Sequence, residues 1–313
     1  MRFIERPRLQ TLARAGLLLL LWLDAMTAGP RPNPTVAPWV YEPNAVRKEL
    51  RPEPVPSIGR SRAMLNVEAE GNLMYTRLTN STDQVMYTRL ALYGNCNLLD
   101  DIPKVAGMYS LFFRELGDVF SYLWMGTNPP AGLADFLAVS HINSPGKATQ
   151  WDFRPNYLPW VTAGQQPLFA DREQTLAALA AKNFDPRRVV FLPLQDRPFV
   201  RTTNSSRLTL TIRNFSAHKV ELEVEAVEPS IVVISQSFYH NWRAYLDDKP
   251  TQLFRANHAF QAVEAPPGRH RLALVYQDYP FRGGALISLT SAAVWGMVFI
   301  RGRKRVLLGK ERN

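Results

Sequence analysis

Residues 208–225 read LTLTIRNFSAHKVELEVE, and this stretch decides the fold class that the sequence predicts. Apolar residues occupy every second position from Leu208 to Ile212, with polar residues between them. The same alternation runs from Val220 to Val224, where glutamates separate the apolar residues. Side chains along a strand point alternately to two faces, so this period predicts two strands that each have one buried and one solvated face. Such strands are typical of antiparallel sheets.

More short strands are expected on the C-terminal side of this pair. Residues 231–234 form a continuous apolar run, as in a central strand, and Trp242, Ala244 and Leu246 share one face of another. Further strands are expected near 252–254, 259–263 and 269–276, with turns at 247–250 and 266–268. Several short strands at this spacing predict an antiparallel β-sandwich over residues 200–280.

A mixed α/β region is expected over residues 60–199. The sequence predicts strands at 66–78 and 85–93, joined by a turn at 80–83. Apolar residues at helical spacing predict a helix from Met108 to Leu123. A short helix that leads into a strand is expected at 131–139, a helix at 175–182 with Asp171 as a possible cap, and a strand from Val189.

An apolar segment lies near the C-terminus. Residues 283–300 read GGALISLTSAAVWGMVFI, contain no charge, and are followed directly by RGRKR. Eighteen helical residues rise about 27 Å, close to the roughly 30 Å hydrocarbon core of a bilayer. The basic stop predicts a transmembrane helix with the tail 301–313 in the cytoplasm. The alternative is a core helix of a globular domain.

The N-terminal segment 1–28 has two interpretations. Residues 17–23 read LLLLLWL, with Arg14 before them and Asp24 after them. The segment is either a transmembrane span or a signal peptide, and both interpretations place the following residues outside the cytoplasm. Residues 29–59 hold eight prolines, which predicts an extended connector between the membrane and the folded part.

The net charge of +10 belongs mainly to the two ends of the chain. Residues 1–14 carry four arginines against one glutamate, and residues 301–313 carry six basic residues against one glutamate. The tails therefore supply +3 and +5, and residues 15–300 only +2. Basic residues beside apolar spans follow the positive-inside rule, and their position argues against nucleic acid as a partner.

No strong catalytic motif is present. The sequence contains no G-x-S-x-G, H-E-x-x-H or P-loop motif and no cysteine-based metal spacing, so no catalytic residue, metal ligand or cofactor is assigned. The single cysteine, Cys96, is expected to be a small buried hydrophobe rather than a reactive thiol. The candidate substrate-binding residues are Trp242, Tyr245, Arg255 and His258, because aromatic faces beside polar groups suit a sugar. The alternative is that the aromatic residues belong to the core of the sandwich.

Three C-terminal segments carry a resemblance to a known family. Residues 237–250 read SFYHNWRAYLDDKP, residues 253–260 read LFRANHAF, and residues 267–272 read PGRHRL. Together with NLLDDIPKVAG at 97–107 and LADFLAVSHI at 133–142, they resemble the C-terminal region of YfhO-like bacterial membrane proteins. Asn241 and Asp248 stand where that family often has glycine. Both residue types tolerate left-handed backbone, so the departures weaken the resemblance little.

The resemblance implies membership of a large multi-span family that is similar to glycosyltransferases using lipid-linked sugars. The presumed catalytic carboxylates of that family lie in an early extracytoplasmic loop, which has no counterpart in this sequence, so none can be carried over. The implied function is a non-catalytic C-terminal portion of such a protein, a fragment or a split partner, with its main domain outside the bacterial cytoplasmic membrane. The implied partners are the lipid bilayer, a catalytic multi-span membrane subunit and an envelope glycan.

Two other functions are possible on the sequence alone. One is a self-standing membrane-anchored binding or structural module. The other is a stand-alone extracytoplasmic hydrolase, which would require His240, His258 and an acidic residue to converge in one cleft. In every case the expected fold class is a membrane-anchored α+β protein, with the mixed region followed by the β-sandwich and flanked by two apolar spans.

Overall fold

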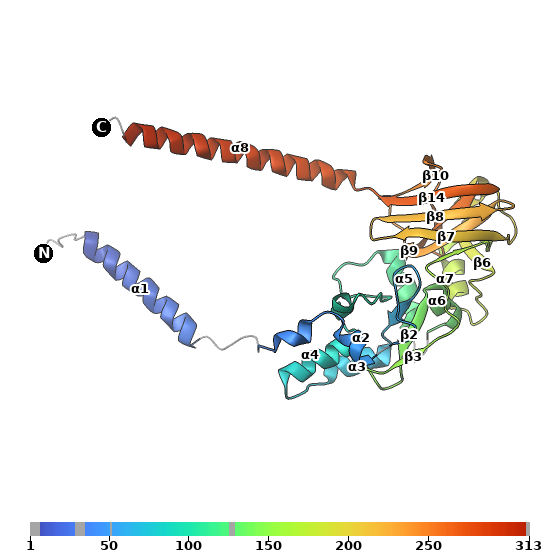
Figure 1. Ribbon diagram of the computed structural model, residues 1–313, viewed down its shortest axis with the longest axis horizontal. Coiled ribbons are helices and arrows are strands. Elements are labelled where there is room, and N and C mark those ends of the chain that lie inside the picture. The colour runs from blue at the N-terminus through green and yellow to red at the C-terminus, as the bar shows by residue number, and fades with distance from the viewer. Residues whose placement is uncertain (1–6, 29–34, 51, 125–128, 311–313) are drawn as a thin grey trace.

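The computed structural model describes residues 7–28, 35–50, 52–124 and 129–310. Helices and short strands of the central part of the chain pack below two C-terminal sheets, and helix α8 extends away from those sheets (Figure 1). The arrangement is a mixed helix and strand fold with antiparallel sheets and an apolar helix toward each end, as the sequence predicts.

The two C-terminal sheets are antiparallel. One has the strand order β11-β10-β14-β8-β7, and the other has the order β12-β13-β9-β4. Their bounds are β4 Val161–Ala163, β7 Leu208–Phe215, β8 Lys219–Ala226, β9 Ser230–Ser237, β10 Trp242–Leu246, β11 Lys249–Thr251, β12 Phe254–Ala256, β13 Phe260–Ala265 and β14 Gly268–Tyr276. The strands predicted from the period-two pattern, β7 and β8, are confirmed and pair with each other. One buried cluster takes Leu222 from the first sheet and Ile234 from the second, so the apolar faces of both sheets contribute to it.

The hairpin turn between β10 and β11 explains the aspartate pair. Asp247 and Asp248 have φ angles of 48° and 63°, in the left-handed region that aspartate tolerates better than most residues. Asp247 also accepts a hydrogen bond from the backbone N–H of Arg271 at 2.8 Å and pairs with the imidazole Nδ1 of His270 at 2.7 Å. The turn is thereby tied to β14, and the expectation of a turn at this position is confirmed.

The mixed region contains most of the helices and two small sheets. Its helices are α2 Ala45–Leu50, α3 Val67–Tyr75, α4 Ser81–Leu90, α5 Arg114–Leu123, α6 Ala131–Phe136 and α7 Arg172–Ala180, with 3-10 helices η1 Pro38–Tyr41, η2 Cys96–Asp100 and η3 Leu194–Phe199. Its strands are β1 Arg62–Met64, β2 Val139–Asn143 and β3 Trp151–Phe153, and the parallel pair β5 Gln166–Ala170 and β6 Val189–Pro193. The predicted step from α6 into β2, the strand β6 and the cap at Asp171 are confirmed. Asp171 and Gln174 form a reciprocal capping box at the start of α7.

Two predicted strands are wrong. The segments 66–78 and 85–93 form helices α3 and α4, because an asparagine caps the N-terminus of each. The side chain of Asn66 accepts from the N–H of Ala69 at 2.7 Å, and that of Asn80 accepts from Thr82 at 2.8 Å. In both segments the asparagine cap therefore favours a helix more strongly than the apolar pattern favours a strand.

The helix predicted from Met108 begins only at Arg114. Asn95 explains the difference, because its side-chain oxygen accepts from the N–H of Met108 and its side-chain nitrogen donates to the carbonyl of Met108, both at 2.9 Å. This pair satisfies the backbone of Met108 outside any helix. Residues 108–113 therefore form an irregular loop before α5.

A buried ion pair fixes the end of the proline-rich connector. Arg89 and Asp100 lie 2.8 Å apart, and both side chains are fully buried. Arg89 also donates to the carbonyls of Val40 and Glu42, and Asp100 accepts from the N–H of Val46 at 3.0 Å. Within its described residues the connector thus contains η1 and α2 and is bound to the domain rather than extended throughout.

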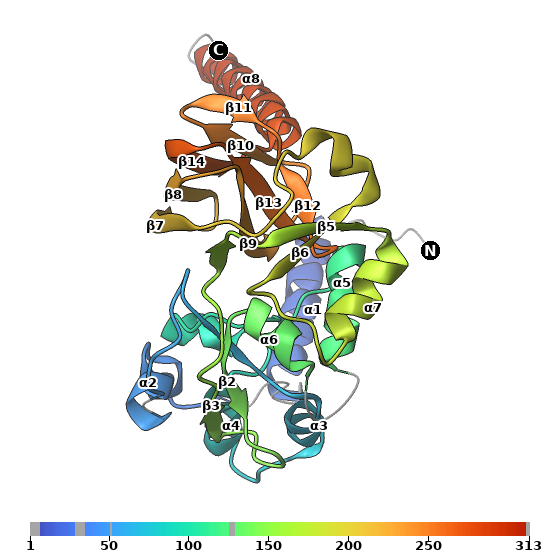
Figure 2. The same ribbon diagram turned by 90° about the vertical axis from the view of Figure 1, so that its right-hand side faces the viewer.

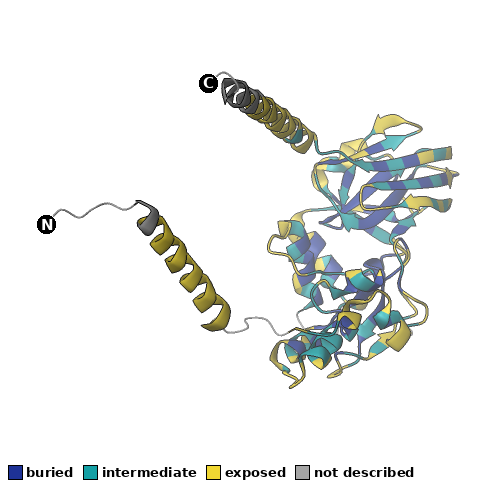
Figure 3. Ribbon diagram, turned by 60° about the vertical axis from the view of Figure 1, so that its left-hand side comes forward, coloured by how far each residue is buried: buried dark blue, intermediate teal, exposed yellow. Residues whose placement is uncertain are grey.

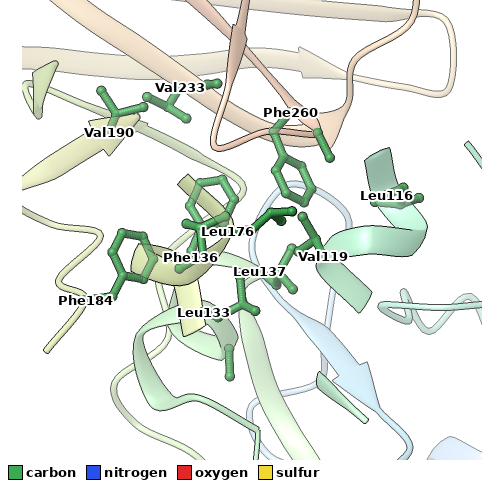
Figure 4. Packing of buried hydrophobic residues seen from close by; sticks show 14 of the residues in the cluster. Leu116, Val119, Leu133, Phe136, Leu137, Leu176, Phe184, Val190, Val233 and Phe260 are labelled. Atoms are coloured by element: carbon green, nitrogen blue, oxygen red, sulfur yellow. The ribbon is translucent and has the colours of Figure 1, made fainter. Parts of the chain in front are cut away.

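The largest buried cluster joins the mixed region to the four-stranded sheet. It includes Leu116 and Val119 of α5, Phe136 of α6, Leu176 of α7 and Phe260 of β13 (Figure 4). The rings of Phe136 and Phe260 meet edge to face at 4.9 Å. This packing holds α5 and α7 beside the sheet and fixes the side chains at their ends.

The two apolar helices are α1 Pro7–Ala28 and α8 Tyr279–Lys310. Residues 10–28 and 279–300 are long and apolar enough to cross a membrane, and neither stretch is buried in the protein (Figure 3). Two residues separate the end of β14 from the start of α8, and Asp278 accepts from the N–H of Phe281 at 2.9 Å. The exposed apolar surface of both helices is consistent with association with a lipid bilayer.

Candidate functional site

A pocket of about 650 Å³ lies beside the N-terminal ends of two helices. Helix α5, the start of α7, the β6–η3 segment and the β12–β13 turn line it, and we call it the α5–α7 pocket. Figure 2 shows α5 and α7 side by side, below β6 and β12. The volume lies within the range of small-molecule sites, about 300 to 1,000 Å³.

Charged side chains pair across this pocket. Nη1 of Arg255 lies 2.7 Å from Oε1 of Glu115. Oδ2 of Asp118 lies 2.9 Å from Nη2 of Arg172 and 2.9 Å from Nε2 of His258. Two acids of α5 are therefore matched by basic groups from α7 and from the β12–β13 segment.

The carboxyl groups of the pocket divide into two kinds. Burial would raise the pKa of Asp118, but hydrogen bonds from Arg172 and His258 outweigh it and lower the pKa. A hydrogen bond from Arg255 lowers the pKa of Glu115. Asp196 of η3 has its pKa raised by burial, which the positive charge of Arg255 opposes. The acids of α5 thus hold their charge for the ion pairs more readily than ordinary carboxyl groups, whereas burial makes Asp196 easier to protonate.

Asn257 positions His258. Both residues have positive φ angles, 44° and 69°, so the turn between β12 and β13 uses left-handed backbone. Oδ1 of Asn257 accepts from the N–H of Phe191 at 2.9 Å, and its own N–H donates to the carbonyl of Phe191 at 2.8 Å. The buried Asn257 therefore fastens the turn to β6 and directs the imidazole of His258 toward Asp118.

Aromatic rings extend the site toward a second hollow. The guanidinium of Arg255 lies 4.8 Å from the ring centre of Phe238, as in a cation–π contact. Phe238 and Leu253 line both the α5–α7 pocket and a neighbouring groove of about 340 Å³. We call the second hollow the β10 groove, since Trp242 and Tyr245 of β10 line it.

The structure divides the four candidate residues between these two hollows. Arg255 and His258 face the α5–α7 pocket, and Trp242 and Tyr245 line the β10 groove. Trp242 is only 6% exposed and packs edge to face on Tyr276 at 5.6 Å. The hydroxyl of Tyr245 accepts from Nε2 of Gln277 at 3.2 Å, just before α8. Both aromatic residues therefore also support the fold.

His240 does not join His258 in one pocket. It is exposed and lines the β10 groove, whereas the acid beside His258 is Asp118. Among the residues that the structure describes, His240, His258 and an acid therefore do not meet in one cleft, as a stand-alone hydrolase would require.

Sequence reasoning missed the acidic half of the pocket. Glu115 and Asp118 lie in the first half of α5, and charged residues are ordinary on the surface of a helix. A partial signal exists, because Glu115 and Asp118 are three positions apart and so share one face of α5. Their pairing with Arg255 and His258 depends on tertiary packing, which the sequence pattern does not encode.

The pocket offers hydrogen-bonding groups beside an aromatic ring. Paired carboxylates, guanidinium groups and an imidazole can bind several hydroxyl groups at once, and Phe238 can pack against an apolar face of a ligand. Within the four described ranges, no three His, Cys, Asp or Glu side chains gather to hold a metal ion. Burial raises the pKa of Cys96, so its thiol has no activated thiolate character.

A comparison with protein families gives a match over part of the chain. Residues 171–288 match the model of a family described as bacterial membrane protein YfhO. Neither a curated protein nor a solved structure matches the chain. The matched segment contains Arg172, Arg255 and His258, while Glu115 and Asp118 lie before it. The segment 171–288 is therefore a YfhO-like region of a bacterial membrane protein.

Proposed function

We propose that this chain is the non-catalytic, extracytoplasmic C-terminal portion of a YfhO-like membrane protein implicated in glycosyl transfer to cell-envelope polymers. In this proposal α1 and α8 anchor the protein in the cytoplasmic membrane, and the sheets form a β-sandwich outside it. The α5–α7 pocket binds a segment of envelope glycan. A catalytic multi-span subunit would provide the transfer chemistry.

The observation that carries the glycan proposal is the composition of the α5–α7 pocket. Arg255 and His258 each pair with an acid of α5, and Arg255 also lies over Phe238. These groups are planar and held by their partners, so little freedom is lost when they bind a ligand. A sugar presents hydroxyl groups at its edge and C–H groups on its face, which match this combination of polar groups and ring.

The topology proposal is supported by the distribution of charge and apolar surface. Helix α8 follows β14 after two residues, its residues 279–300 are predominantly apolar, and the basic sequence RGRKR follows at 301–305. Such a basic end favours the cytoplasmic side, which would place the sheets on the opposite side.

Glycan binding by the purified full-length chain in detergent tests the proposal. We expect Arg255→Gln and His258→Gln each to weaken the binding of bacterial envelope oligosaccharides about tenfold, because each removes a charge-assisted hydrogen bond. Arg213→Gln is the matched control, since Arg213 pairs with Glu223 on the exposed face of β7. Equal binding by all four proteins would refute a glycan site in this pocket.

The alternative proposal is a self-standing membrane-anchored binding or structural module. Gentle solubilisation and affinity purification of the tagged full-length chain distinguishes the two. A stoichiometric multi-span membrane protein in the eluate would support the split subunit, and a chain that purifies alone while still binding glycan would support the module.

A further inference from the structure

Residues 108–113, which we call the apolar loop, read MYSLFF and precede α5. Five of the six side chains are large and apolar, and all five are exposed; Leu111 is 89% exposed. Scattered apolar residues on a surface are normal, but a contiguous exposed group of this kind marks an interaction site.

The apolar loop has a defined conformation. The reciprocal hydrogen bonds between Asn95 and the backbone of Met108 fix its beginning. The rings of Tyr109 and Phe112 pack with their centres 4.5 Å apart, and Phe113 packs on Tyr239 at 4.8 Å. Hydrogen bonds at the beginning of the loop and ring packing at its end therefore hold it in place.

A series of ring contacts links the apolar loop to the start of α8. Phe113 packs on Tyr239, and Tyr239 stacks on Tyr276 with ring centres 6.4 Å apart and planes inclined by 13°. Tyr276 ends β14, three residues before α8 begins at Tyr279. The loop thus lies beside the point at which the apolar helix leaves the domain.

The first turn of α8 has the composition of a membrane interface. Tyr279 and Phe281 are exposed, and the guanidinium of Arg282 lies 5.9 Å from the ring centre of Tyr279. Aromatic and basic residues gather at the headgroup level of membrane-spanning helices. A bilayer crossed by α8 would therefore begin close to the ring series that ends at Phe113.

We propose that the apolar loop docks on the bilayer surface, with Leu111 and Phe112 inserted at the boundary between headgroups and acyl chains. The inference rests on the proposed anchoring by α8. The occupant is the lipid bilayer because the loop is continuous, through Tyr239 and Tyr276, with the interfacial turn of α8. Docking fixes the angle between the domain and the membrane, which α8 by itself leaves free.

Arg114 connects this contact with the α5–α7 pocket. It is exposed, directly follows the apolar loop, and lines the pocket. A long basic side chain beside an inserted loop can reach lipid phosphates while its stem covers apolar surface. The pocket then opens close to the bilayer surface.

Lipid quenching of a fluorescent label tests the inference on the full chain in phospholipid vesicles. The probe is an NBD group on Leu111→Cys in a Cys96→Ser background, with doxyl lipids as quenchers. The matched control is Val227→Cys, because Val227 is an exposed apolar residue that directly follows β8. Lys219, at the start of β8, pairs with Val275 and Ala226 with Gly268, so Val227 lies at the end of the sheet remote from α8, about 25 Å away.

We expect doxyl quenching at position 111 to exceed that at position 227 at least fivefold, with a blue-shifted emission. Equal quenching at both positions in vesicles that retain the protein would overturn the docking and leave the anchoring intact. A blue shift at position 111 without lipid quenching would mean that protein covers the loop, and would also overturn it. Loss of the chain from floated vesicles would refute the anchoring together with the docking. An unchanged melting temperature of both labelled proteins shows that the fold is retained, since both positions are exposed.

Discussion

Nε2 of His258 lies 2.9 Å from Oδ2 of Asp118, although 140 positions separate the two residues in the chain. His258 belongs to the matched YfhO-like region and Asp118 to the segment before it. The contact therefore joins the two parts of the protein at the α5–α7 pocket, and the site is incomplete without either part.

Asp118 and His258 should be energetically coupled. We expect the double-mutant cycle of Asp118→Asn and His258→Gln to give a coupling free energy of about 0.5 to 1 kcal/mol, since the pair is only partly shielded from solvent. Chemical denaturation of the full chain in detergent measures it. Arg213→Gln with Asp118→Asn is the control cycle, for which additive effects are expected. Additivity in the first cycle as well would mean that the contact contributes nothing.

Asn257 should matter through both its side chain and its backbone. We expect Asn257→Ala to lower the free energy of unfolding by about 2 to 3 kcal/mol, because it leaves the N–H of Phe191 without its acceptor and puts alanine at a positive φ. Asn257→Gly relieves the backbone strain and should cost about 1 kcal/mol less. Thermal melts of the two variants separate the effects, and identical melts would contradict a role for the backbone angle.

The contact of His270 with Asp247 should make stability depend on pH. The hydrogen bond to Asp247 raises the pKa of His270 above its usual value near 6.5, so the folded state binds this proton more tightly than the unfolded state. The stabilisation is fully present below that usual value and is lost as pH rises through the folded pKa. We expect the melting temperature of the unaltered protein to fall more than that of His270→Gln between pH 6 and pH 8. Parallel curves would contradict the pairing.

The buried pair of Arg89 and Asp100 should be costly to break singly. We expect Arg89→Met to destabilise the protein by about 3 to 5 kcal/mol, since it leaves a buried charge without its partner. The double variant with Asp100→Asn should cost clearly less than the sum of the single changes. The same variants should expose the connector near Val40 to protease, because Arg89 donates to its carbonyl. Additive costs would show that the two charges act independently.

The C-terminal strands could be predicted from the sequence because their signal is local. The alternation from Leu208 to Ile212 and from Val220 to Val224 directly reflects burial on one face of β7 and β8. The turn at Asp247 and Asp248 follows from the tolerance of aspartate for left-handed backbone. In both cases the residues that carry the signal are those that form the element.

Other features depended on residues distant in the sequence. The side chain of Asn95 binds the backbone of Met108 from 13 positions away, and the helix therefore does not begin at Met108. The spacing of apolar residues cannot reveal such a hydrogen bond. Asn66 and Asn80 cap helices, although the apolar residues that follow them favour strands and Asn80 itself favours a turn. The sequence indicates Arg255 and His258 but not their partners, because Glu115 and Asp118 belong to α5 and meet them only after packing.

Protease treatment of intact spheroplasts that carry a C-terminal epitope tag tests the central claim most directly. If α8 crosses the membrane with the two sheets outside, the domain between α1 and α8 is digested while a short tagged fragment with α8 and the basic tail stays protected. Survival of the full-length chain until the cells are lysed would place the domain inside and contradict the account.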